Sequence, residues 1–223
     1  MNQVRITHYS DILCVWAYVS QIRINELMDN YGENIELEYL FFSVFGNVVG
    51  KIDKQWKSKG GRTAYSQHVQ EVVGQFGHLS VHSDIWIKDP PFSSLPCHLY
   101  LCAAQLAEEN GKLECGTFKE LAWQIRKSFF SEAKDISNIS IIREIIEDKG
   151  LPLSEFESNI VNGKAYARLS SHMQRALDSY VRASPTLTFN DDRQRLTGNV
   201  GYRIIEANVR ELIERPEMQQ TWC

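Results

Sequence analysis

The sequence predicts an α/β protein whose four-stranded mixed sheet is divided into two halves by a large block of helices. Strand patterns occur near both ends of the 223-residue chain, and helical patterns fill the region between them. The predicted order is β-α-β, then about five helices, then β-β-α. A β-α-β half and a β-β-α half together form a mixed sheet with helices on both faces. A chain of this length can form one domain that carries a large insertion.

The first half contains a strand, a helix and a second strand. Residues 4–9 alternate apolar and polar side chains, which predicts a strand. Residues 35–42 alternate and then become wholly apolar, which predicts a second strand with a buried end. The helix between them is predicted from apolar residues at i, i+3, i+4 and i+7, namely Ile24, Leu27, Met28 and Tyr31. Short connections of this kind predict a right-handed parallel crossover.

The middle of the chain is predicted to be helical apart from two connections. Residues 46–61 contain four glycines and residues 82–96 are rich in Pro, Ser and Asp, so both segments are predicted to be loops. Thr117 and Ser154 each precede a glutamate by three residues, which is the spacing of a capping box at a helix start. Apolar stripes predict helices over about 63–76, 99–106, 117–129, 139–146 and 164–180, with another beginning near residue 154.

Strand patterns return after the helices. Residues 185–189 and 193–197 predict two antiparallel strands, joined by a hairpin turn at Asn190-Asp191-Asp192. A final helix is predicted to start near Asn199, an acceptable N-cap residue, and to end before Pro216.

The composition is that of a soluble globular protein, with 43% apolar and 23% charged residues. The net charge is −4 and no basic run is interleaved with aromatic residues, so we expect no nucleic-acid partner. No stretch approaches ~18 uninterrupted apolar residues, so no membrane span is predicted. The N-terminus lacks the pattern of a secretory signal, and we therefore expect a cytoplasmic protein.

The cysteines and histidines do not form a recognisable metal site. The odd cysteine count and the lack of a C-x-x-C pair fit neither a disulfide framework nor a zinc site. Two of the six histidines, His78 and His82, lie four residues apart, but Gly77 argues against a helix there. No bound metal is therefore expected. The five cysteines are Cys14, Cys97, Cys102, Cys115 and Cys223.

Cys14 lies where the first strand is predicted to turn into the first helix. The unpaired backbone N–H groups and the positive end of the dipole at a helix start favour a thiolate. We therefore expect the pKa of Cys14 to be lowered from about 8.5, which makes the thiol nucleophilic. The alternative is that Cys14 is a small buried hydrophobic residue, a common role of free cysteine.

The element order, with Cys14 at the first helix and Ser184-Pro185-Thr186 opening the third strand, resembles the thioredoxin fold. The helical insertion narrows the resemblance to the DsbA-like superfamily. Residues 11–18, Asp-Ile-Leu-Cys-Val-Trp-Ala-Tyr, are similar to the D-x-x-C-P-W-C-Y signature of its FrnE-type cytoplasmic members. Their relatives are the kappa-class glutathione transferases and the 2-hydroxychromene-2-carboxylate isomerases. The resemblance implies a thioredoxin-like domain formed by residues 1–60 and 182–223, and a helical insertion domain formed by residues 61–181.

The resemblance assigns the attacking thiol to Cys14. Ala17 stands where the family has its second, resolving cysteine, and Val15 stands where the family often has proline. The proline before the third strand, Pro185, matches one that the family holds in the cis form. The residues expected to bind substrate are Trp16, Ser184, Pro185 and Thr186. The residues expected to line the site are Ser10, Tyr18 and Asn199.

These features predict a monothiol thiol–disulfide oxidoreductase of the DsbA/FrnE type. Because Ala17 supplies no sulfur, Cys14 forms a mixed disulfide that an external thiol such as glutathione must resolve. One alternative is a glutathione-dependent transferase or isomerase of the kappa or hydroxychromene type, although residues 198–202 lack the acidic residue of the kappa pattern. The other alternative is a non-catalytic binding protein that uses the same cleft.

The expected partner is a thiol or disulfide substrate, either a peptide or a small molecule. Glutathione is expected as a co-substrate, and no tightly bound cofactor is expected. We expect neither a nucleic-acid nor a membrane partner, and the chain is expected to be a monomer or a homodimer.

Overall fold

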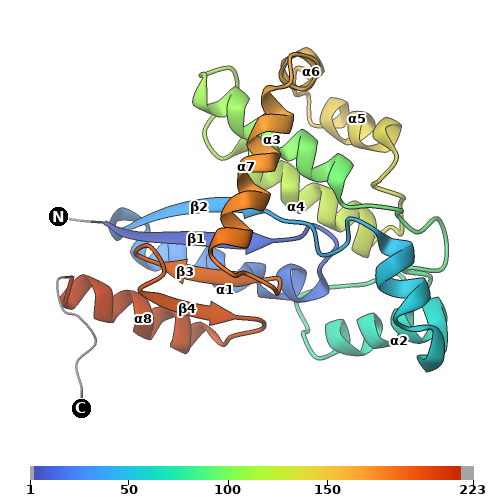
Figure 1. Ribbon diagram of the computed structural model, residues 1–223, viewed down its shortest axis with the longest axis horizontal. Coiled ribbons are helices and arrows are strands. Elements are labelled where there is room, and N and C mark those ends of the chain that lie inside the picture. The colour runs from blue at the N-terminus through green and yellow to red at the C-terminus, as the bar shows by residue number, and fades with distance from the viewer. Residues whose placement is uncertain (1–2, 217–223) are drawn as a thin grey trace.

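The computed structural model describes residues 3–216 and contains a four-stranded mixed sheet (Figure 1). β1 pairs with β2 in parallel and with β3 antiparallel, and β4 pairs antiparallel with β3. The predicted β-α-β and β-β-α halves are therefore confirmed, and β1 and β3 join them. The strands, in the spatial order β2-β1-β3-β4, are β1 (Val4–Ser10), β2 (Ile35–Phe41), β3 (Thr186–Phe189) and β4 (Gln194–Thr197).

Helices α1 (Val15–Tyr31) and α8 (Tyr202–Glu214) cover one face of the sheet. The core beneath them includes Ile6 and Phe189 from the sheet, Leu27 from α1 and Val209 from α8. Leu27 belongs to the apolar stripe from which the first helix was predicted, and it is fully buried. This layer fixes the start of α1 against the carboxyl end of β1.

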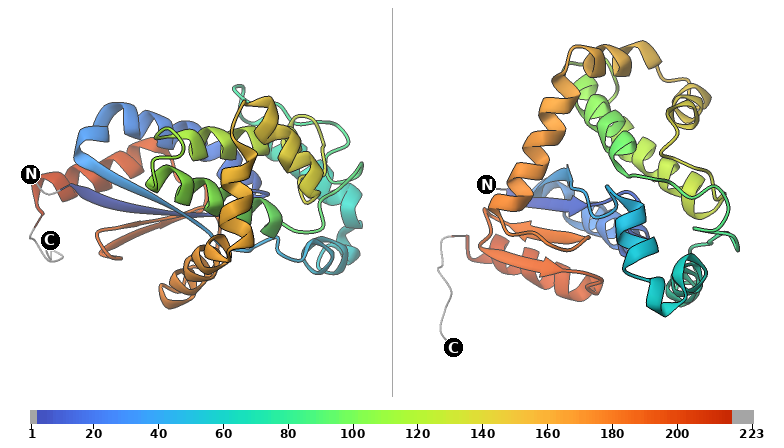
Figure 2. Two further views of the ribbon diagram at one scale, coloured as in Figure 1. Left: turned by 90° about the horizontal axis from the view of Figure 1, so that it is seen from above. Right: turned by 45° about the vertical axis from the view of Figure 1, so that its right-hand side comes forward.

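The remaining helices lie between β2 and β3, a stretch that the structure describes throughout. α3 is at the centre of this block and packs against α4, α6 and α7, while α7 brings the chain back beside β2 (Figure 2). Within residues 3–216, no helix is long and apolar enough to span a membrane. The helices are α2 (Gly61–Gly74), α3 (Leu95–Glu109), α4 (Thr117–Phe130), α5 (Ile139–Asp148), α6 (Leu153–Val161) and α7 (Lys164–Asp178).

One hydrophobic core joins this helical block to the first turn of α1. It contains Leu13 and Val15 beside Cys14, Phe45 from the segment after β2, and Phe129 from α4. The helices between β2 and β3 therefore share buried surface with the start of α1. The division into a thioredoxin-like domain and a separate insertion domain stays a prediction.

Residues 49–59 are more ordered than the predicted loop. Val49–Lys54 form a π-helical turn, η2, and Lys57–Lys59 form a 3-10 turn, η3. Ile52 in η2 is fully buried, so this segment contributes to the core in spite of its glycines. A further 3-10 turn, η1 (Gly32–Asn34), connects α1 to β2.

The capping box predicted at the start of α4 is wrong. The carboxylate of Glu108, on α3, accepts hydrogen bonds from the backbone amides of Gly116 and Phe118. The Thr117 hydroxyl instead donates to the carbonyl of Glu114 over 2.7 Å. A carboxylate satisfies free N–H groups at a helix start and interacts favourably with the dipole. Glu108 therefore caps α4 from another helix.

The caps of α6 and α8 also differ from the prediction, although α6 begins at Leu153, close to the predicted residue 154. α6 has no side-chain cap, and Pro152 occupies the position before it. α8 begins after Gly201, so Asn199 is not its N-cap residue. The Asn199 side chain accepts a hydrogen bond from Arg23 of α1 instead.

Leu27→Ala is expected to destabilise the protein by about 2–5 kcal/mol, because it leaves a cavity between the sheet, α1 and α8. Ile22→Ala on the same helix is the control, since Ile22 is 47% exposed, and we expect it to change the stability by less than about 1 kcal/mol. Urea unfolding followed by circular dichroism measures both values. Equal losses in the two variants would contradict the buried position of Leu27.

Candidate functional site

Cys14 occupies the N-cap position of α1, directly after the turn that follows β1. Its backbone is extended, with φ −79° and ψ 117°, as is usual for an N-cap residue. The Cys14 amide donates to the Asp11 carbonyl over 3.1 Å, and the Cys14 carbonyl accepts from the Tyr18 amide over 3.0 Å. The predicted position at a helix start is confirmed, but only 5% of Cys14 is exposed.

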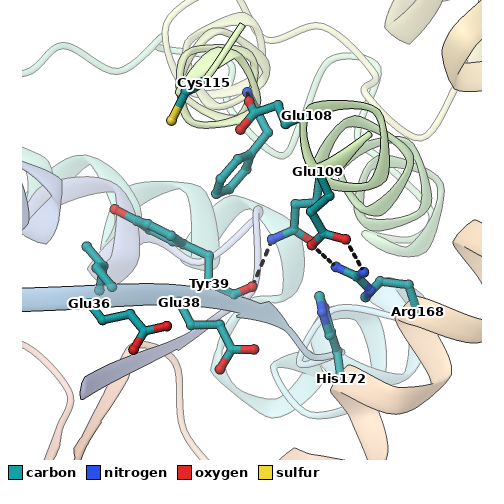
Figure 3. A pocket seen from close by; sticks show the side chains of 11 residues that line it. Glu36, Glu38, Tyr39, Glu108, Glu109, Cys115, Arg168 and His172 are labelled. Atoms are coloured by element: carbon teal, nitrogen blue, oxygen red, sulfur yellow. Dashed lines mark hydrogen bonds and ion pairs between the residues drawn. The ribbon is translucent and has the colours of Figure 1, made fainter. Parts of the chain in front are cut away.

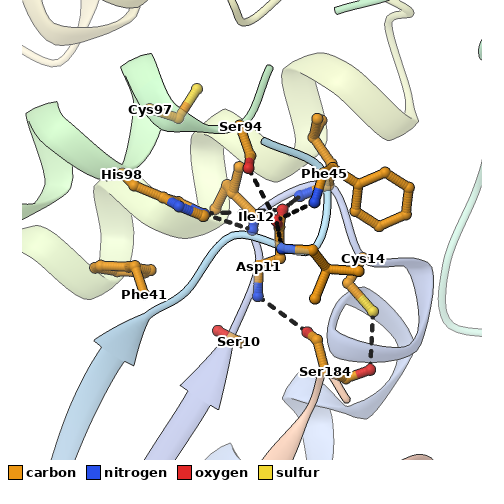
Figure 4. Close-up of polar contacts among 12 residues, drawn as sticks. Ser10, Asp11, Ile12, Cys14, Phe41, Phe45, Ser94, Cys97, His98 and Ser184 are labelled. Atoms are coloured by element: carbon orange, nitrogen blue, oxygen red, sulfur yellow. Dashed lines mark hydrogen bonds and ion pairs between the residues drawn. The ribbon is translucent and has the colours of Figure 1, made fainter. Parts of the chain in front are cut away.

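The Cys14 sulfur contacts the segment that leads into β3 (Figure 4). Sγ lies 3.1 Å from the Ser184 carbonyl oxygen and donates a hydrogen bond to it. The Ser184 hydroxyl accepts from the Asp11 amide over 2.9 Å. The peptide bond between Ser184 and Pro185 is cis, as the family resemblance implied. The fold therefore brings together the predicted nucleophile and two of the predicted substrate-binding residues.

The Asp11 carboxylate organises the backbone around Cys14 and is itself fully buried. Oδ2 accepts from the amides of Val44 and Phe45 and from the Ser94 hydroxyl, each over 2.8 Å. Oδ1 accepts from the Leu13 amide over 2.9 Å. Hydrogen bonds to a charged acceptor are stronger than those between neutral groups, and these bonds offset the cost of burying the charge. Asp11 thus joins the turn after β1 to the segment after β2 and to α3.

His98 and Arg126 complete the buried surroundings of this turn. The Ile12 amide donates to His98 Nε2 over 3.1 Å, and burial lowers the pKa of His98. The imidazole is therefore neutral, although Nε2 lies 3.8 Å from the Asp11 carboxylate. Arg126 on α4 donates to the Ser10 hydroxyl over 3.3 Å. No sequence pattern signals either residue, because both lie on helices far from this turn in the chain.

Burial raises the pKa of the Cys14 thiol above its ordinary value. Hydrogen bonds from the Ser184 side chain and from the amides of Ala17 and Trp16 oppose this effect, whereas the Asp11 carboxylate adds to it. The predicted lowering of the pKa is therefore wrong. The amides at the helix start do act on the sulfur, but the loss of solvation outweighs them.

The residues beside Cys14 and Pro185 are largely enclosed. Ala17 is fully buried. Trp16 is half-buried and packs against the core that contains Cys14. The Thr186 hydroxyl donates to the Ala183 carbonyl over 2.8 Å. The roles of Trp16, Thr186 and their neighbours in substrate binding stay predictions.

The residues predicted to line the site have other hydrogen-bond partners. The Tyr18 hydroxyl donates to the Ser80 carbonyl over 3.2 Å instead of to the sulfur. Ser10 accepts from Arg126, as described above. Asn199 is held by Arg23. Whether these residues contact a bound substrate stays a prediction.

Three further cysteines lie in the described part of the chain, and Cys223 lies outside it. Burial raises the pKa of the Cys97 thiol and raises that of Cys102 to about 12. Cys115 is exposed and lines a separate pocket beside β2. Between residues 3 and 216, no group of three or more His, Cys, Asp or Glu side chains is arranged to hold a metal.

Comparison with known proteins gives relatives over nearly the whole chain. The ClpXP adapter protein SpxH of Bacillus subtilis (strain 168) is 25% identical over 225 residues, which cover 98% of this chain and 71% of SpxH.

Solved structures with this fold include enzymes of thiol chemistry. A proposed protein disulfide isomerase from Nitrosomonas europaea has a TM-score of 0.76 at 14% identity, covering 96% of this chain and 99% of that one. The cytosolic disulfide reductase DsbM from Pseudomonas aeruginosa, solved with GSH, has a TM-score of 0.64 at 13% identity, covering 95% and 98%. A 2-hydroxychromene-2-carboxylate isomerase has a TM-score of 0.66 at 15% identity, covering 97% and 100%. At these sequence identities the structural likeness shows that the proteins share a fold, and nothing about a shared activity.

A family model described as thioredoxin matches residues 8–210. This range contains the helix start at Cys14, the helical block and the segment before β3. The structural neighbours agree with the predicted thioredoxin-like fold with a helical insertion. The chain therefore belongs to the thioredoxin family.

Proposed function

We propose that this protein is a monothiol thiol–disulfide oxidoreductase in which Cys14 is the exchanging thiol. The observation that carries the proposal is the 3.1 Å contact between Cys14 Sγ and the Ser184 carbonyl. The sulfur lies between the amides of a helix start, which favour negative charge, and the backbone leading into β3. We propose that an extended substrate pairs with that backbone. Ala17 supplies no second sulfur, so the exchange uses one thiol of this chain.

The proposed reaction has two exchange steps. Cys14 Sγ loses its proton to solvent, and the thiolate attacks one sulfur of a substrate disulfide. The substrate S–S bond breaks, its other sulfur leaves as a thiolate, and Cys14 is joined to the substrate in a mixed disulfide. A glutathione thiolate then attacks the substrate sulfur of the mixed disulfide. Cys14 leaves as a thiolate, and the substrate sulfur is joined to glutathione.

The raised pKa of Cys14 makes both steps slow at neutral pH. Attack requires the thiolate, which is a small fraction when the pKa lies above the ambient pH. A thiol with a high pKa is also a poor leaving group, so a disulfide to Cys14 persists. Deprotonation also removes the hydrogen bond that Sγ donates to Ser184. We therefore propose a long-lived mixed disulfide as the main reaction intermediate.

Glutathione is the external thiol that we propose. Cys97 and Cys102 are buried and have raised pKa values, so neither is suited to resolve the mixed disulfide. DsbM, which shares the fold, was solved with GSH. A cytoplasmic location, which we propose together with this function, keeps thiols reduced and supplies glutathione.

A non-catalytic binding protein is the second candidate. Two observations favour it, namely the burial of Cys14 and the resulting rise in its pKa. The similarity to SpxH, a ClpXP adapter protein, is also consistent with a role in holding another protein. In this case Cys14 is a small buried residue beside the binding cleft, and it takes no part in thiol–disulfide exchange.

Oxidised glutathione is expected to form a mixed disulfide with the Cys14 thiol. The control Cys14→Ser lacks this thiol and is expected to form no adduct at position 14. The rate is expected to keep rising with pH between about pH 7 and 9 without a plateau, because burial raises the pKa of the thiol and the thiolate stays the minor form. Mass spectrometry of the intact protein and its peptides measures the adduct. The protein with Cys14 and its Cys14→Ser control both carry Cys115→Ser, which removes the exposed thiol. A plateau near pH 7 would contradict the raised pKa. The lack of an adduct at any pH would favour the binding protein.

Ser184→Ala is expected to slow alkylation of Cys14 about three- to tenfold at pH 8. The substitution removes a hydrogen bond that stabilises the thiolate, so the pKa of Cys14 rises further. Ser20→Ala is the control. Ser20 is buried as Ser184 is, but it lies on α1 and bonds to the Ala17 carbonyl. Iodoacetamide labelling rates measure the effect. An unchanged rate in Ser184→Ala would mean that the hydroxyl does not act on the sulfur.

Ala17→Cys is expected to release glutathione from Cys14 at least about tenfold faster than Ala17→Ser does, because the second thiol is held close to the first. The product is an internal disulfide between Cys14 and the introduced cysteine. Mass spectrometry after removal of free glutathione follows the loss of the adduct. Equal release in the two variants would show that position 17 does not take the resolving role.

A further inference from the structure

A second candidate site lies at the open edge of β2 (Figure 3), and Cys14 is not among the residues that line it. A cavity of about 390 Å³ lies between β2, α3, α7 and the start of α4. Cavities of this size accommodate small molecules or single side chains. Because β2 is the outer strand of the sheet, one side of its backbone is not paired with another strand. The proposed exchange reaction uses no residue of this cavity.

Gln105 carries an acceptor without a partner in the cavity wall. Only 8% of Gln105 is exposed, and its Nε2 donates to the Tyr39 carbonyl over 2.9 Å. Because a carbonyl only accepts, the amide nitrogen must face Tyr39, which leaves Oε1 for another group. Among the described residues, Oε1 has no hydrogen-bond partner. A buried acceptor without a donor is unfavourable, and a donor that enters the cavity removes this cost.

Two carboxylates of the wall are already paired with arginines. Glu109 forms two hydrogen bonds with Arg168, over 2.7 and 2.6 Å. Glu38 forms two with Arg175, over 2.5 and 2.7 Å. Arg168 is the basic residue of the wall, and Glu109 neutralises it. The wall therefore has no arginine left to attract an anion.

The other two carboxylates, Glu36 and Glu108, remain without a cation. In the described chain neither has a basic side chain within ion-pair distance, and Figure 3 shows Glu108 at the top and Glu36 at the lower left of the pocket. Glu108 accepts amide hydrogen bonds at the start of α4, which leaves its formal charge in place. His172 adds no charge at neutral pH, because burial lowers its pKa to about 4. Lys119 places one ammonium group against Tyr39, but the four carboxylates of the wall still outnumber the cations beside them, so the cavity has a net negative charge.

Aromatic rings form a further part of the wall. Tyr39 and Phe118 pack edge to face with their centroids 5.5 Å apart. Lys119 Nζ lies 5.6 Å from the centroid of the Tyr39 ring, so this ring already accepts an ammonium group of the same chain. Ring faces attract cations electrostatically. Lys119 already occupies the Tyr39 ring, so the two rings give the ligand an apolar wall beside the carboxylates.

We propose that this cavity binds an organic cation whose ammonium or guanidinium group donates to Gln105 Oε1 and to the carboxylates of Glu36 and Glu108. Such a group has donors only, and it matches a wall that offers acceptors and negative charge. The cation comes either from a free amine or from a lysine or arginine side chain of another protein. Both sources present the same group to the cavity.

Calorimetric titration at low salt tests the proposal with four probes. Spermidine and agmatine represent free amines, and the capped peptides acetyl-Ala-Lys-Ala-amide and acetyl-Ala-Arg-Ala-amide represent protein side chains. Saturable one-site binding of any probe is the expected result. Binding of the amines alone assigns a small molecule, and binding of the peptides alone assigns a protein side chain. Cys14→Ser is expected to bind as the wild type does, which separates this site from the exchange reaction.

Matched variants locate the binding. The double variant Glu36→Gln/Glu108→Gln is expected to weaken it at least about tenfold, because two charges are removed while the acceptor oxygens remain. Glu26→Gln/Glu71→Gln makes the same charge change on exposed residues outside the cavity, and we expect less than about twofold weakening. Gln105→Leu is expected to weaken binding with the net charge unchanged, and urea unfolding checks that each variant folds. No saturable binding of any probe, or equal losses in the two double variants, would overturn the proposal.

Discussion

The hydrogen bonds of the buried Asp11 carboxylate are the constraint on which the rest of the site depends. A charge removed from water is tolerated only where donors replace the water. Asp11 obtains its donors from three segments: the turn itself at Leu13, residues 44 and 45 after β2, and Ser94 before α3. The same turn ends at Cys14, so the position of the sulfur follows from these bonds. The hydrogen bonds of Asp11 that hold three segments of the fold together therefore also fix the start of α1.

This anchor also opposes the chemistry that the site is proposed to perform. The negative charge of Asp11 and the burial of Cys14 both favour the neutral thiol. The Ser184 hydroxyl and the amides of the helix start favour the thiolate, but more weakly. The burial and the Asp11 charge that belong to this stable turn therefore outweigh the groups that favour the thiolate. A protein with this balance suits slow exchange with a persistent adduct better than rapid turnover.

The element order was predictable because apolar periodicity reports which local face is buried. Three predictions depended only on residues that are neighbours in the chain, and the structure agrees with them: the strand at residues 4–9, the helix stripe around Leu27 and the hairpin turn at residues 190–192. The cap of α4 and the pKa of Cys14 were not predictable in this way. Glu108 reaches α4 from a different helix, and the burial of the sulfur depends on segments far away in the sequence. Periodicity contains no information about such contacts.

The first turn of α3 has a consequence for the modularity of this fold. Ser94 and His98 lie one helical turn apart, and each bonds to the loop that precedes α1, Ser94 through the Asp11 carboxylate and His98 through the Ile12 amide. The helical block is therefore not an interchangeable cassette. A chimera that takes its helices from another family member must retain a hydroxyl and an imidazole at these two positions. Without them the graft deprives the Cys14 loop of two of its supports, even when the sheet is unchanged.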